Sequence, residues 1–251
     1  MQFQILGPLR VIDGRPVVVT GKRRRILLLA LLAQANSTVA TDDLVDWLWP
    51  RRPPRSARGT LHAHVSALRR TLEPQRPPRR PSRRLLTSPN GYLLRVDADE
   101  LDALRFQYLV GAAGPALEKG DAEEAYRLAT EALALWRGPA LADGADVEAA
   151  RYEITRLEEL RLTAVTLRIE AVLALGGHLD AVPELTGLVA RYPLHERFHV
   201  LLMIALSRCG RRADALAVYR RARTVLAREL HVAPGRDLRD TEAAILSGEL
   251  G

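Results

Sequence analysis

The stretch SARGTLHAHVSALRRTLE, residues 56–73, decides the fold of the N-terminal part of this chain. Its apolar residues recur at the spacing of one face of an α-helix, at Leu61, Val65, Leu68 and Leu72. Prolines lie just before and just after the stretch, and the hydroxyl of Ser56 can accept a hydrogen bond from a free backbone N–H. The pattern therefore predicts a helix over residues 56–73 that begins at Ser56.

The other faces of this predicted helix carry Arg, Thr, Ser and His, with no acidic residue before Glu73. Arg can form two hydrogen bonds with guanine, and short hydroxyl side chains reach bases or phosphates, so this face suits a DNA major groove. A merely solvated helix face is the alternative, although such a face usually carries both charge signs. We expect base contacts farthest from the apolar stripe, from Thr60, His62, Ala63, Ser66 and Arg70. We expect phosphate contacts from the flanking residues Arg58, His64 and Arg69.

Charge divides the chain into two parts. Residues 1–96 contain 18 Lys and Arg against 5 Asp and Glu, a net charge of +13, and the remainder contains 19 against 25, a net charge of −6. A chain of 251 residues is long enough for two domains. Because the basic part attracts a polyanion and the acidic part does not, we expect a DNA-binding domain over residues 1–96 and a separate interaction domain over residues 97–251.

Composition limits the other possibilities. The single cysteine excludes an internal disulfide framework. The longest apolar run, residues 26–33, is far too short to span a membrane, and no secretory signal is visible at the N-terminus. We therefore expect a protein of the cytoplasm, associated with the nucleoid, with no membrane partner.

The elements around residues 56–73 follow from local patterns. Residues 3–11 and 16–20 are β-rich runs joined through Asp13-Gly14, and residues 38–40 form a short extended piece. The wholly apolar run within residues 23–34 predicts a buried central helix, and the run Thr41-Asp42-Asp43 is expected to cap a helix over residues 43–49. Asn90-Gly91 between residues 85–87 and 92–96 predicts a β-hairpin.

Further contacts with DNA are expected outside the predicted helix 56–73. Arg23 and Arg24 begin the central helix and could contact the phosphate backbone, or form a solvated helix end. The Pro- and Arg-rich loop 74–83 cannot be helical. Its arginines, Arg83 among them, either contact phosphates or belong to a solvated, disordered insertion. The hairpin is expected to approach DNA through Thr87, Ser88, Asn90 and Tyr92.

Residues after 97 contain helical segments and no convincing strand. The predicted helices cover residues 98–117, 122–136, 145–175, 179–192, 194–208, 211–230 and 234–247, with Gly248 ending the last one. Gly176 and Gly210 lie 34 residues apart, which is the tetratricopeptide period. The order of elements before residue 97, which is strands, helix, short strand, two helices and hairpin, predicts an α+β winged helix-turn-helix. The residues after it predict an all-α, tetratricopeptide-like domain that can bind another protein.

The segment His195-Glu196-Arg197-Phe198-His199 matches the H-E-x-x-H pattern of zinc peptidases. Arg197 places a positive charge inside the motif, and no convincing third ligand follows. We therefore expect no catalytic residue, no metal and no cofactor, and we keep a zinc metallopeptidase only as a remote alternative.

The run from Leu61 to Arg70, LHAHVSALRR, resembles the recognition helix of OmpR-type winged helices, and Gly91-Tyr92 resembles the wing of that family. Trp136-Arg137-Gly138, followed by Leu141 and Asp143, resembles a part of the bacterial transcriptional activation domain. From Phe3 nearly to its C-terminus, the whole chain resembles the Streptomyces antibiotic regulatory protein (SARP) family.

This resemblance implies a transcriptional activator without enzymatic activity. Such activators bind direct repeats in promoters of secondary-metabolite gene clusters as side-by-side protomers, and recruit RNA polymerase holoenzyme through its sigma factor. The implied partners are therefore double-stranded DNA, RNA polymerase and a second copy of the chain. Many relatives have Arg at the positions of Ala67 and Ser88, so the preferred DNA sequence or the affinity can differ.

Two further alternatives stay open at this point. The chain could repress transcription by occluding a promoter, with its helical domain serving only to form dimers. It could also be a helical-repeat scaffold whose basic half binds acidic proteins instead of DNA.

Overall fold

The computed structural model describes residues 1–77 and 79–250. Pro78 in the predicted arginine-rich loop and Gly251 at the end of the predicted second domain therefore lie outside the described residues. Two compact units are present: unit 1 comprises residues 1–110 and 131–162, and unit 2 comprises residues 111–130 and 163–250. None of the helices in the described ranges is long and apolar enough to cross a membrane. The predicted domain boundary between residues 96 and 97 stays a prediction.

Unit 1 begins with a small antiparallel sheet of β1 (Gln2–Gln4), β2 (Arg10–Asp13) and β3 (Arg15–Pro16), in that order. The predicted turn at Asp13-Gly14 joins β2 to β3, and Gly14 has a φ of 66°, which suits glycine. The predicted strands 3–11 and 16–20 are too long, because residues 5–9 direct their backbone groups elsewhere. The N–H groups of Ile5 and Leu6 donate to the carboxylate of Asp102, and their carbonyl groups accept from Leu141 and Arg137.

The predicted central helix is α1 (Lys22–Ala33). Its apolar run from Ile26 to Leu32 is buried on every side, which is why this segment needs no polar face. Helices α2 (Thr41–Leu48) and α3 (Ala57–Leu72) pack against it. The apolar stripe predicted for α3 faces this core, and all four of its residues are at most 3% exposed.

The predicted side-chain caps of α3 and α2 do not form. Ser56 is the N-cap residue of α3, as predicted, and its carbonyl oxygen accepts from the backbone N–H of Thr60. Its hydroxyl makes no hydrogen bond to the start of the helix. Thr41 is the first residue of α2, and its Oγ1 donates to the carbonyl of Asn90, 3.3 Å away. The tertiary contact with the hairpin therefore replaces the expected local cap.

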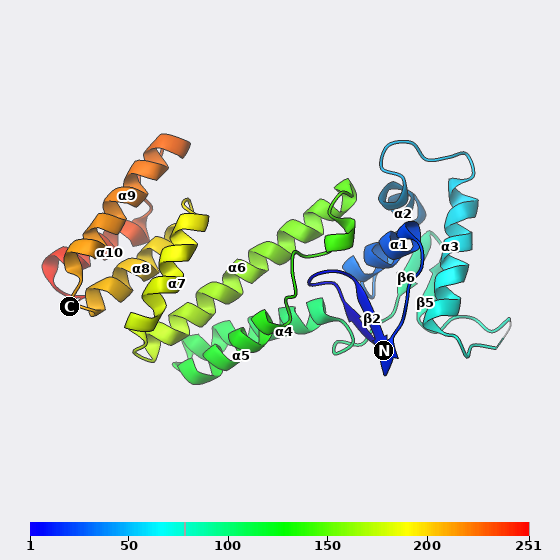
Figure 1. Ribbon diagram of the computed structural model, residues 1–251, viewed down its shortest axis with the longest axis horizontal. Coiled ribbons are helices and arrows are strands. Elements are labelled where there is room, and N and C mark those ends of the chain that lie inside the picture. Colours follow the sequence, from blue (N-terminus) through cyan, green and yellow to red (C-terminus); the bar gives the residue numbers. More distant parts are fainter. Residues whose placement is uncertain (78, 251) are drawn as a thin grey trace. The chain divides into compact units, whose positions relative to one another are not determined.

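A second sheet, of order β4-β6-β5, includes the predicted hairpin, which lies beside α3 (Figure 1). Its strands are β4 (Thr38–Ala40), β5 (Leu85–Ser88) and β6 (Gly91–Leu94). In the hairpin Ser88 pairs with Gly91, and β6 pairs with β4 so that Val39 opposes Tyr92. A Cβ atom at Gly91 would lie 1.9 Å from the carbonyl oxygen of Val39, so this close approach requires glycine.

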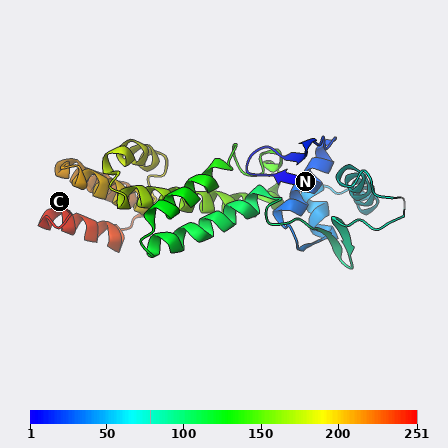
Figure 2. The same ribbon diagram turned by 90° about the horizontal axis from the view of Figure 1, so that it is seen from below.

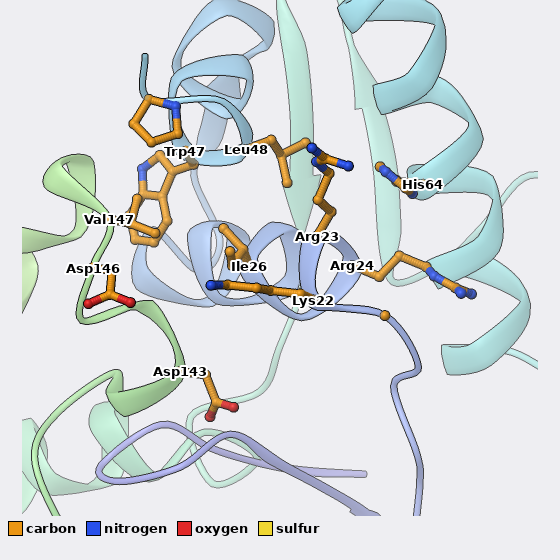
Figure 3. A pocket seen from close by; sticks show the side chains of 12 residues that line it. Lys22, Arg23, Arg24, Ile26, Trp47, Leu48, His64, Asp143, Asp146 and Val147 are labelled. Carbon is orange, nitrogen blue, oxygen red and sulfur yellow. The ribbon is translucent and has the colours of Figure 1, made fainter. Parts of the chain in front are cut away.

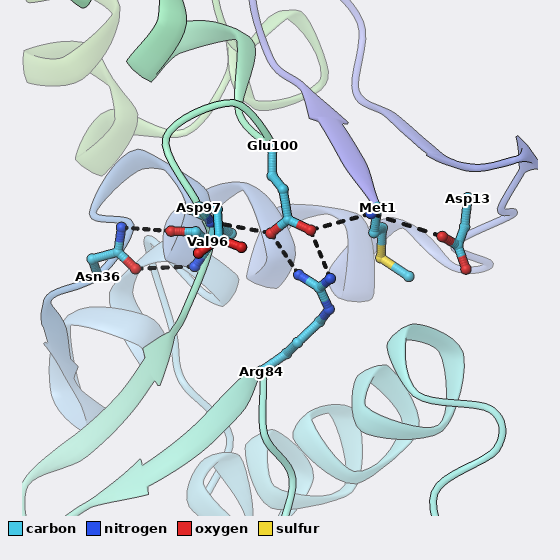
Figure 4. A network of polar contacts seen from close by, with 7 residues as sticks. All are labelled: Met1, Asp13, Asn36, Arg84, Val96, Asp97 and Glu100. Atoms are coloured by element: carbon cyan, nitrogen blue, oxygen red, sulfur yellow. Dashed lines mark hydrogen bonds and ion pairs between the residues drawn. The ribbon is translucent and has the colours of Figure 1, made fainter.

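A polar network joins the start of this hairpin to the segment that follows it (Figure 4). Arg84 forms two 2.7 Å hydrogen bonds with Glu100, which also contacts the N-terminal amino group. The bond from Arg84 is the largest cause that lowers the pKa of Glu100, to about 2. Asn36 donates to the carbonyl of Val96 and accepts from its N–H. These contacts keep the chain in place as it leaves β6.

The remaining segments are helical, as predicted. They are α4 (Asp102–Glu118), α5 (Ala122–Ala134), α6 (Arg151–Ala174), α7 (His178–Arg191), α8 (Glu196–Arg208), α9 (Arg212–Leu230) and α10 (Arg236–Ser247). Two short 3₁₀ turns, η1 (Ala142–Gly144) and η2 (Glu148–Ala150), replace the predicted helical start at residue 145. Gly248 ends α10 with a φ of 84°, as expected.

The core of unit 2 lies around α8, which packs against α7, α9 and α10. Figure 2 shows α10, in red, beside α9. Phe198, Met203 and Ala205 of α8 are fully buried, and Ala215 and Ala222 of α9 are small enough to let the two helices approach. The predicted fold class, a winged helix-turn-helix followed by a helical domain, is confirmed.

Candidate nucleic-acid interface

The solvent-facing side of α3 presents five of the eight predicted DNA-contacting residues. Those that are exposed are Arg58, His62, Ala63, Ser66 and Arg70. Thr60, His64 and Arg69 are half-buried at the edges of this face. We call the eight residues together the recognition face. It contains no acidic side chain, so nothing on it repels a phosphate backbone.

Arg58 of the recognition face already forms an ion pair within the chain. Arg58 Nη2 lies 2.8 Å from Asp42 Oδ1 of α2, and both side chains are more than two-thirds exposed. Exposed pairs of this kind contribute little to stability and are screened by salt. Arg58 can therefore exchange Asp42 for a phosphate at small cost. Arg70 has no ion-pair partner among residues 1–77 and 79–250.

The edge of the recognition face next to the hairpin is held by Arg69. Its Nε donates to the carbonyl of Leu85 at 2.9 Å, and its Nη2 donates to Thr87 Oγ1 at 2.7 Å. The guanidinium also lies over the ring of Tyr92, 5.9 Å from the centroid. Tyr92, predicted to approach DNA, is 3% exposed, and its Oη lies 2.6 Å from Nδ1 of His62.

The opposite edge of the recognition face adjoins the beginning of α1. His64 there is close to Arg24 and Arg23; burial first, and then these two cations, lower the pKa of its imidazole. Figure 3 shows Arg24 and His64 on the same side of a cavity of about 600 Å³. The first turn of α1 contains no acidic residue, so Arg23 and Arg24 are repelled both by each other and by the positive end of the helix dipole. An anion such as a phosphate would relieve this repulsion.

The described residues of the loop after α3, 74–77 and 79–83, are non-helical, as predicted, and the loop is attached to the end of the helix. Glu73 accepts hydrogen bonds from Ser82 Oγ and from the N–H of Arg83, the latter at 2.8 Å. Burial raises the pKa of Glu73, but these bonds and the nearby Arg76 together hold it below its usual value. The side chain of Arg83 is exposed beside the recognition helix.

Among the remaining wing residues, Thr87 and Asn90 are exposed and Ser88 is half-buried. Thr38 Oγ1 donates to Ser88 Oγ at 3.1 Å, which connects the wing tip to β4. The structure thus brings the predicted wing residues to the strands beside α3, while Arg23 and Arg24 lie at the other edge. Whether any of them contacts DNA stays a prediction.

The H-E-x-x-H residues serve the packing of unit 2. His199 is 3% exposed, and its Nε2 lies 2.9 Å from the carbonyl of Pro193. Glu196 Oε2 accepts from the N–H of Gly235 at 2.7 Å. In the described part of the chain, no three His, Cys, Asp or Glu side chains are grouped so that they could hold a metal ion.

Residues beyond 96 complete unit 1 through contacts that the sequence patterns do not predict. Asp143 accepts from Arg25 of α1 and from the N–H of Leu9, at 2.6 Å for the latter. Asp102 accepts from the N–H groups of Ile5 and Leu6, at 2.8 and 3.0 Å. The partners are about 100 residues apart or more, so no local pattern indicates them. The only signal was the resemblance around Trp136, which pointed to Asp143 without its partner.

Comparison with known proteins agrees with this architecture. Residues 101–246 match the family described as bacterial transcriptional activator domain, and residues 14–94 match that described as transcriptional regulatory protein, C terminal. The chain is 39% identical to the transcriptional regulator RedD of Streptomyces coelicolor, over 98% of this chain and 71% of RedD. It is 36% identical to the regulatory protein DnrI of Streptomyces peucetius, over 100% of this chain and 94% of DnrI.

Longer relatives also match. The regulatory protein AfsR of Streptomyces griseus is 37% identical over 99% of this chain, which spans 25% of AfsR. A solved structure of Mycobacterium tuberculosis EmbR in complex with a low-affinity phosphopeptide has a TM-score of 0.92 and 35% identity. It covers 98% of this chain, and this chain spans 65% of the EmbR chain.

Proposed function

The chain belongs to the Streptomyces antibiotic regulatory protein family, and from that premise we propose that it activates transcription by binding promoter direct repeats and recruiting RNA polymerase. The family consists of transcriptional regulators, so the chain is a transcriptional regulator and not an enzyme. Its targets, on this proposal, are promoters of a secondary-metabolite gene cluster, and it acts at the nucleoid in the cytoplasm.

The acid-free recognition face of α3 is the observation that carries the proposal. It inserts into a major groove, where Thr60, His62, Ala63, Ser66 and Arg70 face base edges. Cations at the two edges of the face, together with Arg83, then meet the phosphates on either side. The wing tip, residues 88–90, approaches the adjacent minor groove, and Thr87 lies next to it on the wing.

Two protomers bind side by side on a direct repeat, and the helical domain contributes to their association and to activation. The holoenzyme, including its sigma factor, is the proposed partner of the DNA-bound dimer. Sedimentation on DNA with one or two half-sites tests the stoichiometry. The proposal requires two protomers on the repeat, and a single protomer on both DNAs would contradict it.

Run-off transcription tests activation. The template is a promoter that carries the site selected by the purified protein, and the reaction contains purified holoenzyme. Added protein should raise the transcript yield on this template, and it should have no effect when the half-sites are scrambled. A fall in yield on the intact template would instead identify a repressor that acts by occlusion.

A further inference from the structure

The hydroxyl of Tyr92 connects the wing to an exposed residue of α3. Tyr92 lies in β6, which pairs with both β4 and β5, and its side chain is buried. Its Oη is 2.6 Å from Nδ1 of His62, and the two rings meet edge to face at 75° with centroids 6.0 Å apart. One ring nitrogen of His62 is therefore held by the sheet, although the residue itself is exposed on the recognition face.

The position of Tyr92 is itself fixed from two sides. Its backbone pairs with Thr87 on β5 and with Val39 on β4. Arg69 covers its ring while donating to Leu85 and Thr87 of β5. The phenol is thus held by strand pairing on both sides and by Arg69, and it can keep the imidazole in one orientation.

The proton positions follow from the chemistry of the pair. Burial raises the pKa of Tyr92, with Arg69 opposing, so the hydroxyl keeps its proton at neutral pH. A phenol is more acidic than the N–H of an uncharged imidazole, so it is the better donor. When Tyr92 donates to Nδ1, the imidazole carries its own proton on Nε2, because a neutral ring has one donor and one acceptor.

We propose that His62 is a specificity-determining residue that donates from Nε2–H to the acceptor edge of a guanine in the major groove, and that Tyr92 is the positioning residue that sets this tautomer. In that groove guanine presents two acceptors, N7 and O6, and no donor; adenine presents N7 beside an N6 donor, thymine presents O4 alone, and cytosine presents an N4 donor. Nε2 has no hydrogen bond to another residue within 1–77 and 79–250, so it is available to DNA. The inference rests on the proposed function, because it assigns a base contact within the same DNA interface.

Without the Tyr92 hydroxyl, the imidazole exchanges between its two tautomers and can rotate. A ring that offers a donor and an acceptor by turns cannot distinguish guanine from cytosine. The loss therefore concerns base preference at one position, whereas a bond that merely held the wing would affect stability and overall affinity.

The first test reads the tautomer without DNA. Long-range ¹⁵N–¹H spectra of the full chain are recorded at mildly alkaline pH, and His62→Ala assigns the signal. The proposal expects a proton on Nε2 in the wild type and a mixture of tautomers in Tyr92→Phe. A proton on Nδ1 in the wild type would overturn the proposal.

The second test selects sites from a random double-stranded library with wild type, His62→Ala, Tyr92→Phe and the double variant. Tyr108→Phe is the matched control, because Tyr108 is an exposed tyrosine of α4 outside the recognition face. We expect guanine preference at one position to fall by about 2- to 10-fold in His62→Ala, the range of one hydrogen bond. Tyr92→Phe should lower the guanine preference at the same position. The double variant should lose no more of this preference than His62→Ala does, and the control should match wild type.

The outcomes separate the two proposals. If wild type enriches no motif, the proposed function fails and the inference fails with it. If wild type enriches a motif in which Tyr92→Phe changes no position, or lowers all positions equally, only the inference fails. A thermal unfolding curve of Tyr92→Phe shows whether the variant remains folded. A folded variant with a selective loss at the His62 position supports the inference.

Discussion

At the scale of single residues, Arg70 is the arginine of α3 that is best placed to contact a base. It is exposed, it carries no ion pair among the described residues, and it lies one helical turn from Ser66 on the same face. Arg69, its neighbour, uses its guanidinium to hold the hairpin. Arg69 therefore holds the hairpin, and we predict that its neighbour Arg70 contacts DNA.

Arg70→Ala should relax sequence selection and weaken binding to the selected site by about 1–3 kcal/mol, because a guanine would lose its hydrogen-bonding partner. Fluorescence anisotropy with matched and mismatched sites measures both effects. If affinity fell equally for all DNA sequences, and depended less steeply on salt concentration, Arg70 would contact a phosphate instead.

His199 gives unit 2 a predictable dependence on pH. Burial first lowers the pKa of its imidazole from the ordinary value of 6.5, although the bond to Pro193 opposes this change. Because His199 binds a proton more readily in the unfolded chain than in the folded one, its contribution to the free energy of unfolding is fully present above pH 6.5. It should fall as the pH drops below that value.

His199→Gln should flatten this acid limb of the stability curve, measured by urea unfolding between neutral and mildly acidic pH. His231→Gln is the control, because His231 is an exposed histidine of the same unit. A variant curve that falls as steeply as that of wild type would show that the loss in acid comes from other groups.

At the scale of elements, the hairpin and α3 behave as one piece because Arg69 joins them. Arg69→Ala removes two hydrogen bonds of a charged donor and a cation over Tyr92. We expect a loss of roughly 1–3 kcal/mol in the free energy of unfolding, together with faster hydrogen exchange in β5. Arg70→Ala is the matched control. If the two variants lost equal stability, the hairpin would not depend on Arg69.

Local patterns were sufficient for most elements of unit 1. The all-apolar run predicted α1, the 4-3-4 spacing predicted α3, and Asn90-Gly91 predicted the hairpin, because each signal lies within one element. The extent of β1 and the start and cap of α2 were wrong, since Asp102 holds the backbone after β1 and Asn90 holds Thr41. For the same reason, local patterns predicted candidate contact residues but not the contacts of Tyr92 with His62 and Arg69.

At the scale of the whole molecule, the winged helix is completed by residues from the segment after α5. Asp143 joins α1 to the chain before β2 through Arg25 and Leu9, and both side chains of the ion pair are less than one-third exposed. Arg137 donates to the carbonyl of Pro8 at 3.0 Å in the same region. The charge asymmetry of the sequence therefore does not coincide with the limits of unit 1.

Asp143→Asn should destabilise unit 1 by about 1–3 kcal/mol, because Arg25 would lose its charged partner in a partly buried place. Asp146→Asn, at an exposed acidic residue three positions on, is the control. Calorimetry of the full chain measures both. An unchanged transition in Asp143→Asn would mean that this ion pair does not support the winged helix.

We propose that the chain selects a DNA sequence through the recognition face, and the decisive experiment is a random-library selection at several salt concentrations. We expect a direct repeat with half-sites about one helical turn apart, enriched at every salt concentration that permits binding. A steep salt dependence without any enriched motif would mean that the basic half binds only the phosphate backbone, and that the recognition face selects no sequence.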